Sequence, residues 1–507
     1  MVFDSLKGRK LMLINIIYQS PSKRTDWHDY IIVVYRDVIL NRKETFIIED
    51  PEIDIFVVKE EFRNFVKPRH FLTYDKLDKV TVKYKNVLKE IAKIAGPKFV
   101  EYYNTHTRKE CRALYKYPYV LGADIDIKTY YRYEWAVAFG SDIVGTLTKS
   151  YFDIEVDQIN YEGNMAKHGE CPINAFSFAD DSTNTAYEFL LNEPSNPLIK
   201  QMTDNIQEFY QSLHDEFDDA YGKLDYKIYV VDDEREMLRQ IFLLIKQLSP
   251  DVLGGWNIFG FDIRYIIDRA TNLGMDVNDL LCDKEFPNKA HYFFDDIHSF
   301  EFANKRSYFD VASKTHYNDM TITYASLRKS RGAVKRVNLG YVAQKELKDT
   351  KYDYSEVGNI RTLPYNDFKI FTKYSIKDSL LLMALDRKTK DTDNLYLISM
   401  TNYVPYKDAL KQTVVFRALM FGYLKSKGMA LGHNVNFDTD THGKYDENGD
   451  LLEQDDEDES FEGALNGDTM LNNANGVVLY GVPSMFLYKL IIDFDFSSGI
   501  HGRVKPI

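Results

Sequence analysis

Apolar and polar residues alternate with a period of two over residues 149–157, which is typical of a β-strand with one buried face. The apolar positions are Phe152, Ile154 and Val156, and the acidic positions are Asp153, Glu155 and Asp157. Side chains on one face of a strand repeat about every 6–7 Å, so neighbouring carboxylates could share a divalent cation. An edge strand with a solvated acidic face is the alternative, and partners elsewhere in the chain must decide between the two.

The pattern before and after this strand predicts two kinds of structure. Short strand-like runs at residues 31–35 and 52–58, and a helix over 87–95 stopped by Gly96-Pro97, indicate a strand-rich amino-terminal region. From about Gly145 onward, strands alternate with well-formed helices. The chain is therefore expected to have a mixed α/β (α+β) fold with more than one domain.

A second candidate element lies at residues 251–267. Its pattern predicts a buried strand over 252–256, a turn over 257–260 and a helix from Phe261 onward. Asp262 then lies in the first turn of the helix, where favourable interaction with the helix dipole is the alternative explanation. Asn257 could orient a nucleotide or a metal-bound water, and Phe261 could pack beneath it, so both are candidate substrate-binding residues.

A third element is the predicted helix over residues 371–385. Tyr374 and Asp378 are four residues apart and so share one helix face, although packing alone also explains such a pair. The four predicted carboxylates together would suit two divalent ions, Mg²⁺ or Mn²⁺. They are Asp153, Glu155, Asp262 and Asp378. With Tyr374 orienting the attacking water, the expected reaction is phosphodiester hydrolysis.

These three elements, in this order along the chain, resemble the three exonuclease motifs of family B DNA polymerases, particularly the bacteriophage replicative type. The matching motifs are Tyr-Phe-Asp-Ile-Glu at 151–155, Asn-x-x-x-Phe-Asp at 257–262 and Tyr-x-x-x-Asp at 374–378. The resemblance implies a ribonuclease-H-like domain that removes mispaired 3′ nucleotides, with the five acidic and tyrosine residues as its catalytic set. It also implies binding to DNA, as a single-stranded 3′ end and as primer–template, and possible contact with a sliding clamp.

The resemblance also implies a domain order. We expect an amino-terminal domain at 1–145, a 3′–5′ exonuclease domain at 146–392, a helical return to the amino-terminal domain at 393–437, an acidic loop at 438–460 and the start of a polymerase palm at 461–507.

The carboxyl-terminal segment departs from the family pattern. Residues 490–500 resemble polymerase motif A, which would make Asp495 a polymerase metal ligand. Gly499-Ile500-His501-Gly502 stands where the family has Leu-Tyr-Pro-Ser, so the aromatic residue that excludes ribonucleotides is missing, and the second carboxylate hairpin is not found downstream. Polymerisation is therefore expected to need a second polypeptide. The alternatives are a stand-alone DNA exonuclease and a non-catalytic DNA-binding replication subunit.

Composition changes this picture little. The net charge of −13 on 507 residues disfavours a phosphate-rich partner, but the segment 438–459 holds eleven acidic residues and one lysine, so the rest of the chain carries only −3. Three widely spaced cysteines indicate neither a disulfide framework nor a zinc site, which fits a cytoplasmic location, in the host cell if the protein is phage-encoded. No apolar run approaches the length needed to span a bilayer.

Overall fold

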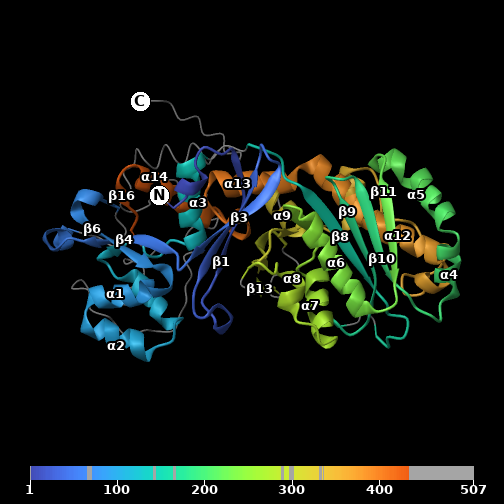
Figure 1. The fold of residues 1–507 in the computed structure, drawn as a ribbon, viewed down its shortest axis with the longest axis horizontal. Coiled ribbons are helices and arrows are strands. Elements are labelled where there is room, and N and C mark those ends of the chain that lie inside the picture. Colours follow the sequence, from blue (N-terminus) through green and yellow to red (C-terminus); the bar gives the residue numbers. More distant parts are fainter. Residues whose placement is uncertain are drawn as a thin grey trace.

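Two β-rich parts lie side by side along the long axis of the molecule (Figure 1). The computed structural model describes residues 2–65, 71–140, 144–163, 167–286, 290–295, 302–329, 334 and 336–432. The expectations for the acidic loop at 438–460, for the palm segment at 461–507 and for Asp495 lie outside the described residues. Within them, no helix is both long and apolar enough to cross a membrane.

The amino-terminal part contains two three-stranded antiparallel sheets, ordered β1-β2-β3 and β6-β4-β7. Their strands are β1 (Leu11–Gln19), β2 (Tyr30–Asp37), β3 (Arg42–Glu49), β4 (Glu52–Val58), β6 (Leu77–Lys83) and β7 (Val120–Leu121). The helices beside them are α1 (Val87–Ala95), α2 (Pro97–Thr105) and α3 (Ile127–Phe139). The predicted strands at 31–35 and 52–58 and the helix over 87–95 are confirmed. Gly96 ends α1 and precedes α2 with φ 114°. This backbone conformation is unfavourable for residues with a Cβ, which explains the glycine.

The second part is built on a six-stranded mixed sheet with the order β11-β10-β9-β8-β12-β15. Its strands are β8 (Lys149–Val156), β9 (Ile173–Asp180), β10 (Thr185–Leu191), β11 (Asp225–Val231), β12 (Val252–Gly255) and β15 (His316–Asp319). The acidic strand β8 pairs antiparallel with β9 and parallel with β12. It is an interior strand, so the alternative of a solvated edge strand is excluded, and the predicted mixed α/β fold is confirmed.

Helices cover both faces of this sheet. One face packs against α12 (Phe368–Thr389), and the other packs against α6 (Glu234–Leu248) and α7 (Asp262–Asn272). The remaining elements of this part are α4 (Pro197–Asp204), α5 (Ile206–Tyr221), α8 (Val277–Leu281), β13 (Ala290–Phe293), β14 (Tyr308–Val311), α9 (Met320–Leu327), α10 (Leu339–Glu346) and α11 (Leu363–Asn366). The alternation along β8 therefore sends its apolar side chains to the α6 and α7 side and its acids to the α12 side.

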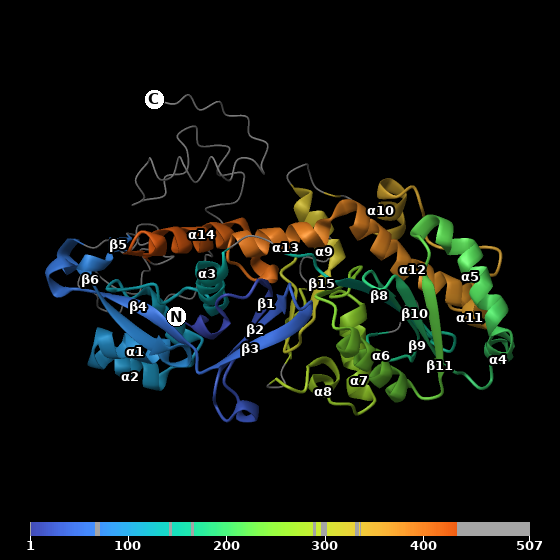
Figure 2. The same ribbon diagram turned by 45° about the horizontal axis from the view of Figure 1, so that its top comes forward.

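After α12 the chain runs back to the amino-terminal part through α13 (Asp391–Thr401) and α14 (Gln412–Ser426), which lie along one side of the molecule (Figure 2). The Tyr396 and Tyr406 hydroxyls donate to backbone carbonyls of β1 at 2.7 Å each. The short strand β16 (Met429–Ala430) then pairs with β5 (Leu72–Thr73). These contacts support the predicted return; its boundaries at 393–437 remain a proposal.

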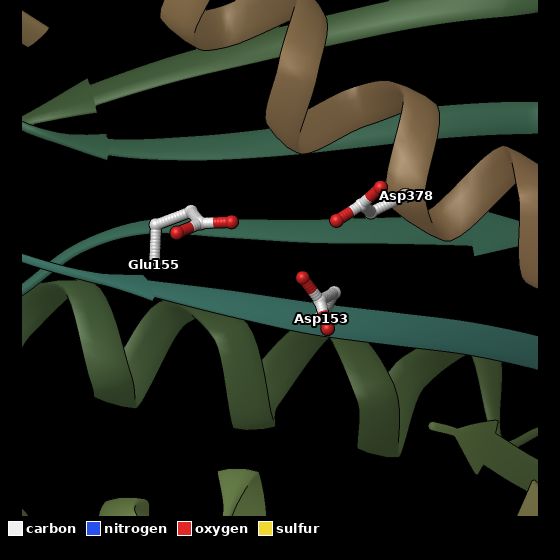
Figure 3. Close-up of side chains that lie close together, drawn as sticks. All are labelled: Asp153, Glu155 and Asp378. Carbon is white, nitrogen blue, oxygen red and sulfur yellow. The ribbon is translucent and has the colours of Figure 1, made fainter. Parts of the chain in front are cut away.

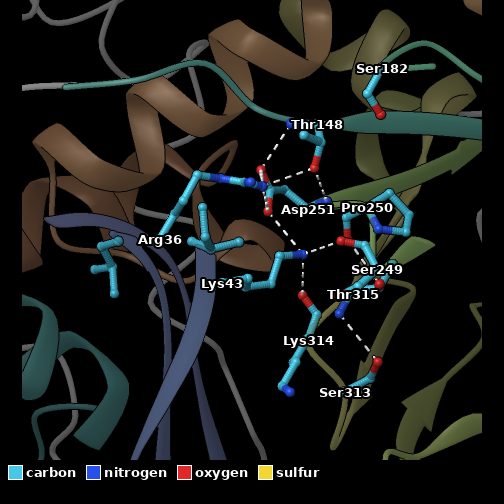
Figure 4. A network of polar contacts seen from close by, with 12 residues as sticks. Arg36, Lys43, Thr148, Ser182, Ser249, Pro250, Asp251, Ser313, Lys314 and Thr315 are labelled. Carbon is cyan, nitrogen blue, oxygen red and sulfur yellow. Dashed lines mark hydrogen bonds and ion pairs between the residues drawn. The ribbon is translucent and has the colours of Figure 1, made fainter. Parts of the chain in front are cut away.

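A buried ion-pair network joins the two parts at the start of β12 (Figure 4). Asp251 is fully buried, and its carboxylate accepts hydrogen bonds at 2.7 Å from Arg36 of β2 and lies 2.9 Å from the ammonium of Lys43 of β3. The backbone N–H of Thr148 donates to the same carboxylate at 2.8 Å. The start of β8 and the start of β12 are thus fixed to the first sheet through one aspartate.

Candidate active site

Asp153 and Glu155 project from β8 toward α12. Phe152 and Ile154 point the opposite way into the core, where Phe152 stacks on Phe176 of β9 with ring centroids 5.3 Å apart. The predicted alternation therefore holds from 152 to 155. A register shift between Glu155 and Val156 then interrupts the pairing. Beyond it, the Asp157 carboxylate accepts a hydrogen bond from Tyr365 at 2.5 Å and does not join the other two acids.

Tyr374 and Asp378 lie one turn apart on α12, as predicted. The helix is 22 residues long and begins after Asp367, whose carboxylate caps it by accepting from the Ile370 N–H at 3.0 Å. Asp378 is fully buried and points down toward β8, and Tyr374 is almost fully buried. One carboxylate oxygen from each of Asp153, Glu155 and Asp378 lies within 4.8 Å of the other two (Figure 3). We call these three residues the carboxylate cluster.

Asp262 approaches the same strand from α7. It is the first residue of that helix and is almost fully buried, and its Oδ1 accepts a hydrogen bond from the Ile154 N–H of β8 at 3.3 Å. The strand before it ends at Gly255, one residue earlier than predicted, and the helix begins at Asp262, one residue later than predicted, with Phe261 at the N-cap position. The structure thus brings three of the four predicted carboxylates together and places Asp262 against the backbone between the two β8 acids.

Asn257 and Phe261 form the turn that leads into α7. Asn257 has φ 61°, and its carbonyl accepts from the N–H groups of Gly260 and Phe261 at 2.9 and 3.0 Å, which closes the turn. A Cβ on Gly260 would lie 2.4 Å from the Asn257 Oδ1, so a larger residue there would require the Asn257 side chain to move. Phe261 packs on Tyr265, with ring centroids 5.4 Å apart. The substrate-binding role of both residues remains a prediction.

Burial and mutual repulsion disfavour the ionised forms of the acids at this site. Burial raises the pKa of Asp153, and the Asp378 carboxylate raises it further. Burial also raises the pKa values of Glu155 and Asp262 well above their usual range, in both cases with Asp153 as the second cause. Burial raises the pKa of Tyr374 as well, and the nearby Glu155 and Asp378 carboxylates add to it. Like charges held together at such a site indicate that a cation compensates them.

Lys351 supplies one compensating charge, and the sequence did not reveal it. Its Nζ donates to Asp378 Oδ2 at 2.5 Å and to the Tyr374 hydroxyl at 3.1 Å. Although burial of the ammonium opposes its charge, the carboxylates of Asp378 and Asp153 keep the pKa of Lys351 raised. In return, Lys351 is the main group that opposes the upward pKa shift of Asp378. A lysine in a charged, polar loop is usually a solvated residue, so no sequence signal distinguished this one.

The donor set of the cluster fits a hard divalent cation. Three carboxylates converge, which are the oxygen ligands that Mg²⁺ and Mn²⁺ prefer. The buried Oδ1 of Asp378 has no hydrogen-bond partner within the part of the chain that the structure describes, so it is free to accept a ligand. Within the described residues, the Lys351 ammonium is hydrogen-bonded to one of these four carboxyl groups, Asp378, so further cations would favour their ionised forms.

The comparison with protein families specifies the class of this sheet domain. Residues 124–331 match the family described as DNA polymerase family B, exonuclease domain. The predicted family B exonuclease region is confirmed for these residues, and the mixed sheet agrees with the ribonuclease-H-like fold of that domain. Family B exonuclease domains use divalent metal ions, in agreement with the composition of the carboxylate cluster.

Individual relatives point to the phage type. The DNA-directed DNA polymerase of Enterobacteria phage T4 is 24% identical over 294 residues, covering 54% of this chain and 29% of the relative. That of Escherichia phage RB69 is 32% identical over 126 residues, covering 24% and 13%. The DNA polymerase catalytic subunit of Murid herpesvirus 1 is 50% identical over 49 residues, covering 10% and 4%. The matches span less than a third of the length of each relative.

Proposed function

We propose that the chain is the amino-terminal part of a phage-type family B DNA polymerase and that its residues 146–392 carry a 3′–5′ proofreading exonuclease. The observation that carries the proposal is the carboxylate cluster. Asp153, Glu155 and Asp378 come from two elements far apart in sequence and converge on one face of the sheet. Asp153 and Glu155 lie within the residues that match the family B exonuclease domain, and α12 brings Asp378 to them from outside that segment. DNA as the substrate is inferred from the polymerase relatives.

In the proposed mechanism, Asp153, Glu155, Asp378 and Asp262 would hold two divalent ions, with Mg²⁺ or Mn²⁺ as the candidates. When bound, such ions would lower the pKa of water and neutralise charge on the phosphate and on the leaving 3′ oxygen. The Tyr374 hydroxyl orients the attacking water. The Lys351 ammonium, 3.1 Å from that hydroxyl, keeps it in place and adds positive charge beside the reacting phosphate.

The proposed substrate-binding residues lie at the end of β12. The Asn257 amide would hydrogen-bond to the terminal nucleotide of a single-stranded 3′ end, and the half-buried Phe261 would support it. Binding of primer–template, contact with a sliding clamp, a cytoplasmic location and the need for a second polypeptide in polymerisation stay predictions. The same holds for the domain boundaries at 145, 392, 437 and 460.

The test is digestion of a 5′-labelled single-stranded oligodeoxynucleotide with Mg²⁺ or Mn²⁺. The double variant Asp153→Ala, Glu155→Ala should lose about 10³-fold or more of the rate, because metal-assisted charge stabilisation is worth several kcal/mol. Asp157→Asn is the matched control, since Asp157 follows the same strand but lies outside the cluster and bonds to Tyr365. That variant should digest DNA like the wild type. Undiminished digestion by the double variant would refute the site assignment.

The same assay separates the two alternatives. A non-catalytic DNA-binding subunit would retain the labelled strand in a filter-binding experiment and release no nucleotides in any divalent metal. A stand-alone exonuclease would digest DNA, and a pull-down with this chain from cells producing it would recover no polymerase polypeptide.

A further inference from the structure

A row of polar residues crosses the α12 side of the six-stranded sheet behind the carboxylate cluster. Asp153 of β8 is paired with Ser177 of β9, and Ser177 is paired with Glu188 of β10. Directly paired residues point to the same face, so all three side chains face α12. The neighbouring positions on this face are apolar and buried: Tyr151, Ala175, Ala179, Ala186 and Leu190. Ser177 and Glu188 therefore interrupt an otherwise apolar surface.

Glu188 is a costly residue at this place. Its side chain is fully buried, and neither carboxyl oxygen forms a hydrogen bond of good geometry within the described residues. Burial raises its pKa well above the usual range, the hydroxyl of Ser375 partly opposes the shift, and Asp153 adds to it. A buried polar group without a good partner destabilises a fold, and an apolar side chain of similar volume is usually preferred. A packing role alone therefore does not account for a glutamate here.

The surroundings connect Glu188 with both sides of the cluster. Ser375 lies on α12 three residues before Asp378, so the two share one helix face, and its hydroxyl is buried without a hydrogen-bond partner of good geometry in the described chain. The hydroxyl of Ser177, between Glu188 and Asp153 in the row, has the same status. Glu188 thus lies within a buried polar group that reaches the Asp153 strand on one side and the Asp378 helix on the other.

We propose that Glu188 is a positioning residue for the carboxylate cluster: through its buried carboxyl group, which faces α12 beside Ser177, it sets how α12 sits over β8, β9 and β10. In this role it fixes the position of the Asp378 carboxylate relative to Asp153. Groups that support metal-binding carboxylates in this way typically change metal affinity or activity by about 10–100-fold when removed. The inference rests on the proposed function, because it assigns Glu188 to the same metal centre.

The test compares Glu188→Leu with Glu188→Gln in the full chain. Leucine removes the carboxyl group and suits the apolar face, so the thermal midpoint should stay equal or rise, while Mn²⁺ binding measured by calorimetry should weaken about 10-fold or more. The kcat for single-stranded DNA should fall by a similar factor with KM little changed. Glutamine keeps hydrogen-bonding groups at the same length and should stay within about threefold of the wild type in Mn²⁺ affinity, which is less than the loss expected for a missing supporting group.

Leu190→Val is the matched control, because Leu190 lies on the same face of the same strand two residues away. It should lower the thermal midpoint without weakening Mn²⁺ binding. The outcome that overturns the inference is Glu188→Leu with the Mn²⁺ affinity and kcat of the wild type, or Glu188→Gln as impaired as Glu188→Leu. Wild-type protein that binds Mn²⁺ but digests no DNA would contradict the proposed function alone, and the Mn²⁺ titrations would still decide the role of Glu188. Wild-type protein that binds no Mn²⁺ would overturn both.

Discussion

Replacing Asp251 by Asn should destabilise the contact between the amino-terminal part and β12 more than any surface substitution. The carboxylate is fully buried and receives only donors: Arg36 at 2.7 Å, Lys43 at 2.9 Å and the Thr148 N–H at 2.8 Å. An asparagine removes the negative charge and brings in an amide NH₂ that must face one of these donors. Two largely buried cations then lose their shared counter-ion.

The expected cost follows from that arrangement. Removing one partner of a buried ion pair typically costs about 3–5 kcal/mol, because the remaining charge stays buried and uncompensated. This is a large part of the roughly 5–15 kcal/mol that stabilises a typical domain. Burial already disfavours the charged form of Lys43 and lowers its pKa to about 8 even with Asp251 present. In the Asp251→Asn variant, Lys43 should therefore lose its proton near neutral pH, which limits the loss to the lower end of the range.

Urea unfolding with tryptophan fluorescence measures the effect, because Trp256 follows β12 directly. The transitions of the two parts are fitted separately, since a chain of this size need not unfold in one step. Asp54→Asn is the control: Asp54 pairs with the exposed Lys79 at 3.2 Å, so its loss should cost less than about 1 kcal/mol. In a Lys43→Met background, Asp251→Asn should cost less than it does alone. A change below about 1 kcal/mol for Asp251→Asn would refute the reasoning.

Three further predictions concern the site and pH. Tyr374→Phe should lower kcat for DNA digestion about 10–100-fold with an unchanged thermal midpoint, and steady-state kinetics with calorimetric melting would check both. Lys351→Met should destabilise the protein more at pH 8 than at pH 5 in EDTA. The pKa of Asp378 is raised in the folded state, so its carboxylate is unfavourable at high pH, and the variant lacks the ammonium that stabilises this charge. Urea titrations at the two pH values measure the losses, and equal losses would contradict the prediction. Burial lowers the pKa of His316 to about 4, so as the pH falls the unfolded chain binds a proton on this residue before the folded protein does. Wild-type stability should therefore fall between pH 6.5 and 4. In His316→Gln this loss of stability should be smaller by about 2–3 kcal/mol. Urea unfolding across that pH window measures the difference.

Local periodicity was enough to predict the elements that carry the site. The two-residue alternation placed Asp153 and Glu155 on one face of β8, and the four-residue spacing placed Tyr374 and Asp378 on one face of α12. Both patterns depend only on backbone geometry, which each residue shares with its near neighbours. The location of β8 inside the sheet could not be predicted in this way, because an edge strand and an interior strand with one polar face have the same alternation. The pairing with β12, a hundred residues further along the chain, decides it.

The residues that the sequence did not reveal depend on contacts between distant segments. Lys351 reaches Asp378 from the loop after α10, and the path of that loop has no periodic signal. Glu188 joins the row of Asp153 only through the registers of two strand pairs, and one residue of slip in either pair would turn it to the other face. The separation of Asp262 from the three clustered acids likewise depends on how α7 meets β8. Sequence spacing fixes none of these relations.

The balance of charge at the site argues that its acids are kept for chemistry and not for stability. Asp153, Glu155, Asp262 and Asp378 each have a raised pKa with burial as the largest cause, so each makes the folded state less stable once it ionises. A structural salt-bridge network would show the opposite, as Asp251 does, where two cations hold the pKa below its usual value despite burial. Among the described residues, Asp251 is thus a buried acid compensated by two cations, whereas the ammonium that hydrogen-bonds to the site acids is that of Lys351, and it contacts Asp378 alone of the four. That contrast is expected if cations from solution neutralise the four acids. Mn²⁺ should then raise the unfolding temperature of the wild type and leave that of the Asp153→Ala, Glu155→Ala variant unchanged. An equal effect of Mn²⁺ on both proteins, or no effect on either, would refute this explanation.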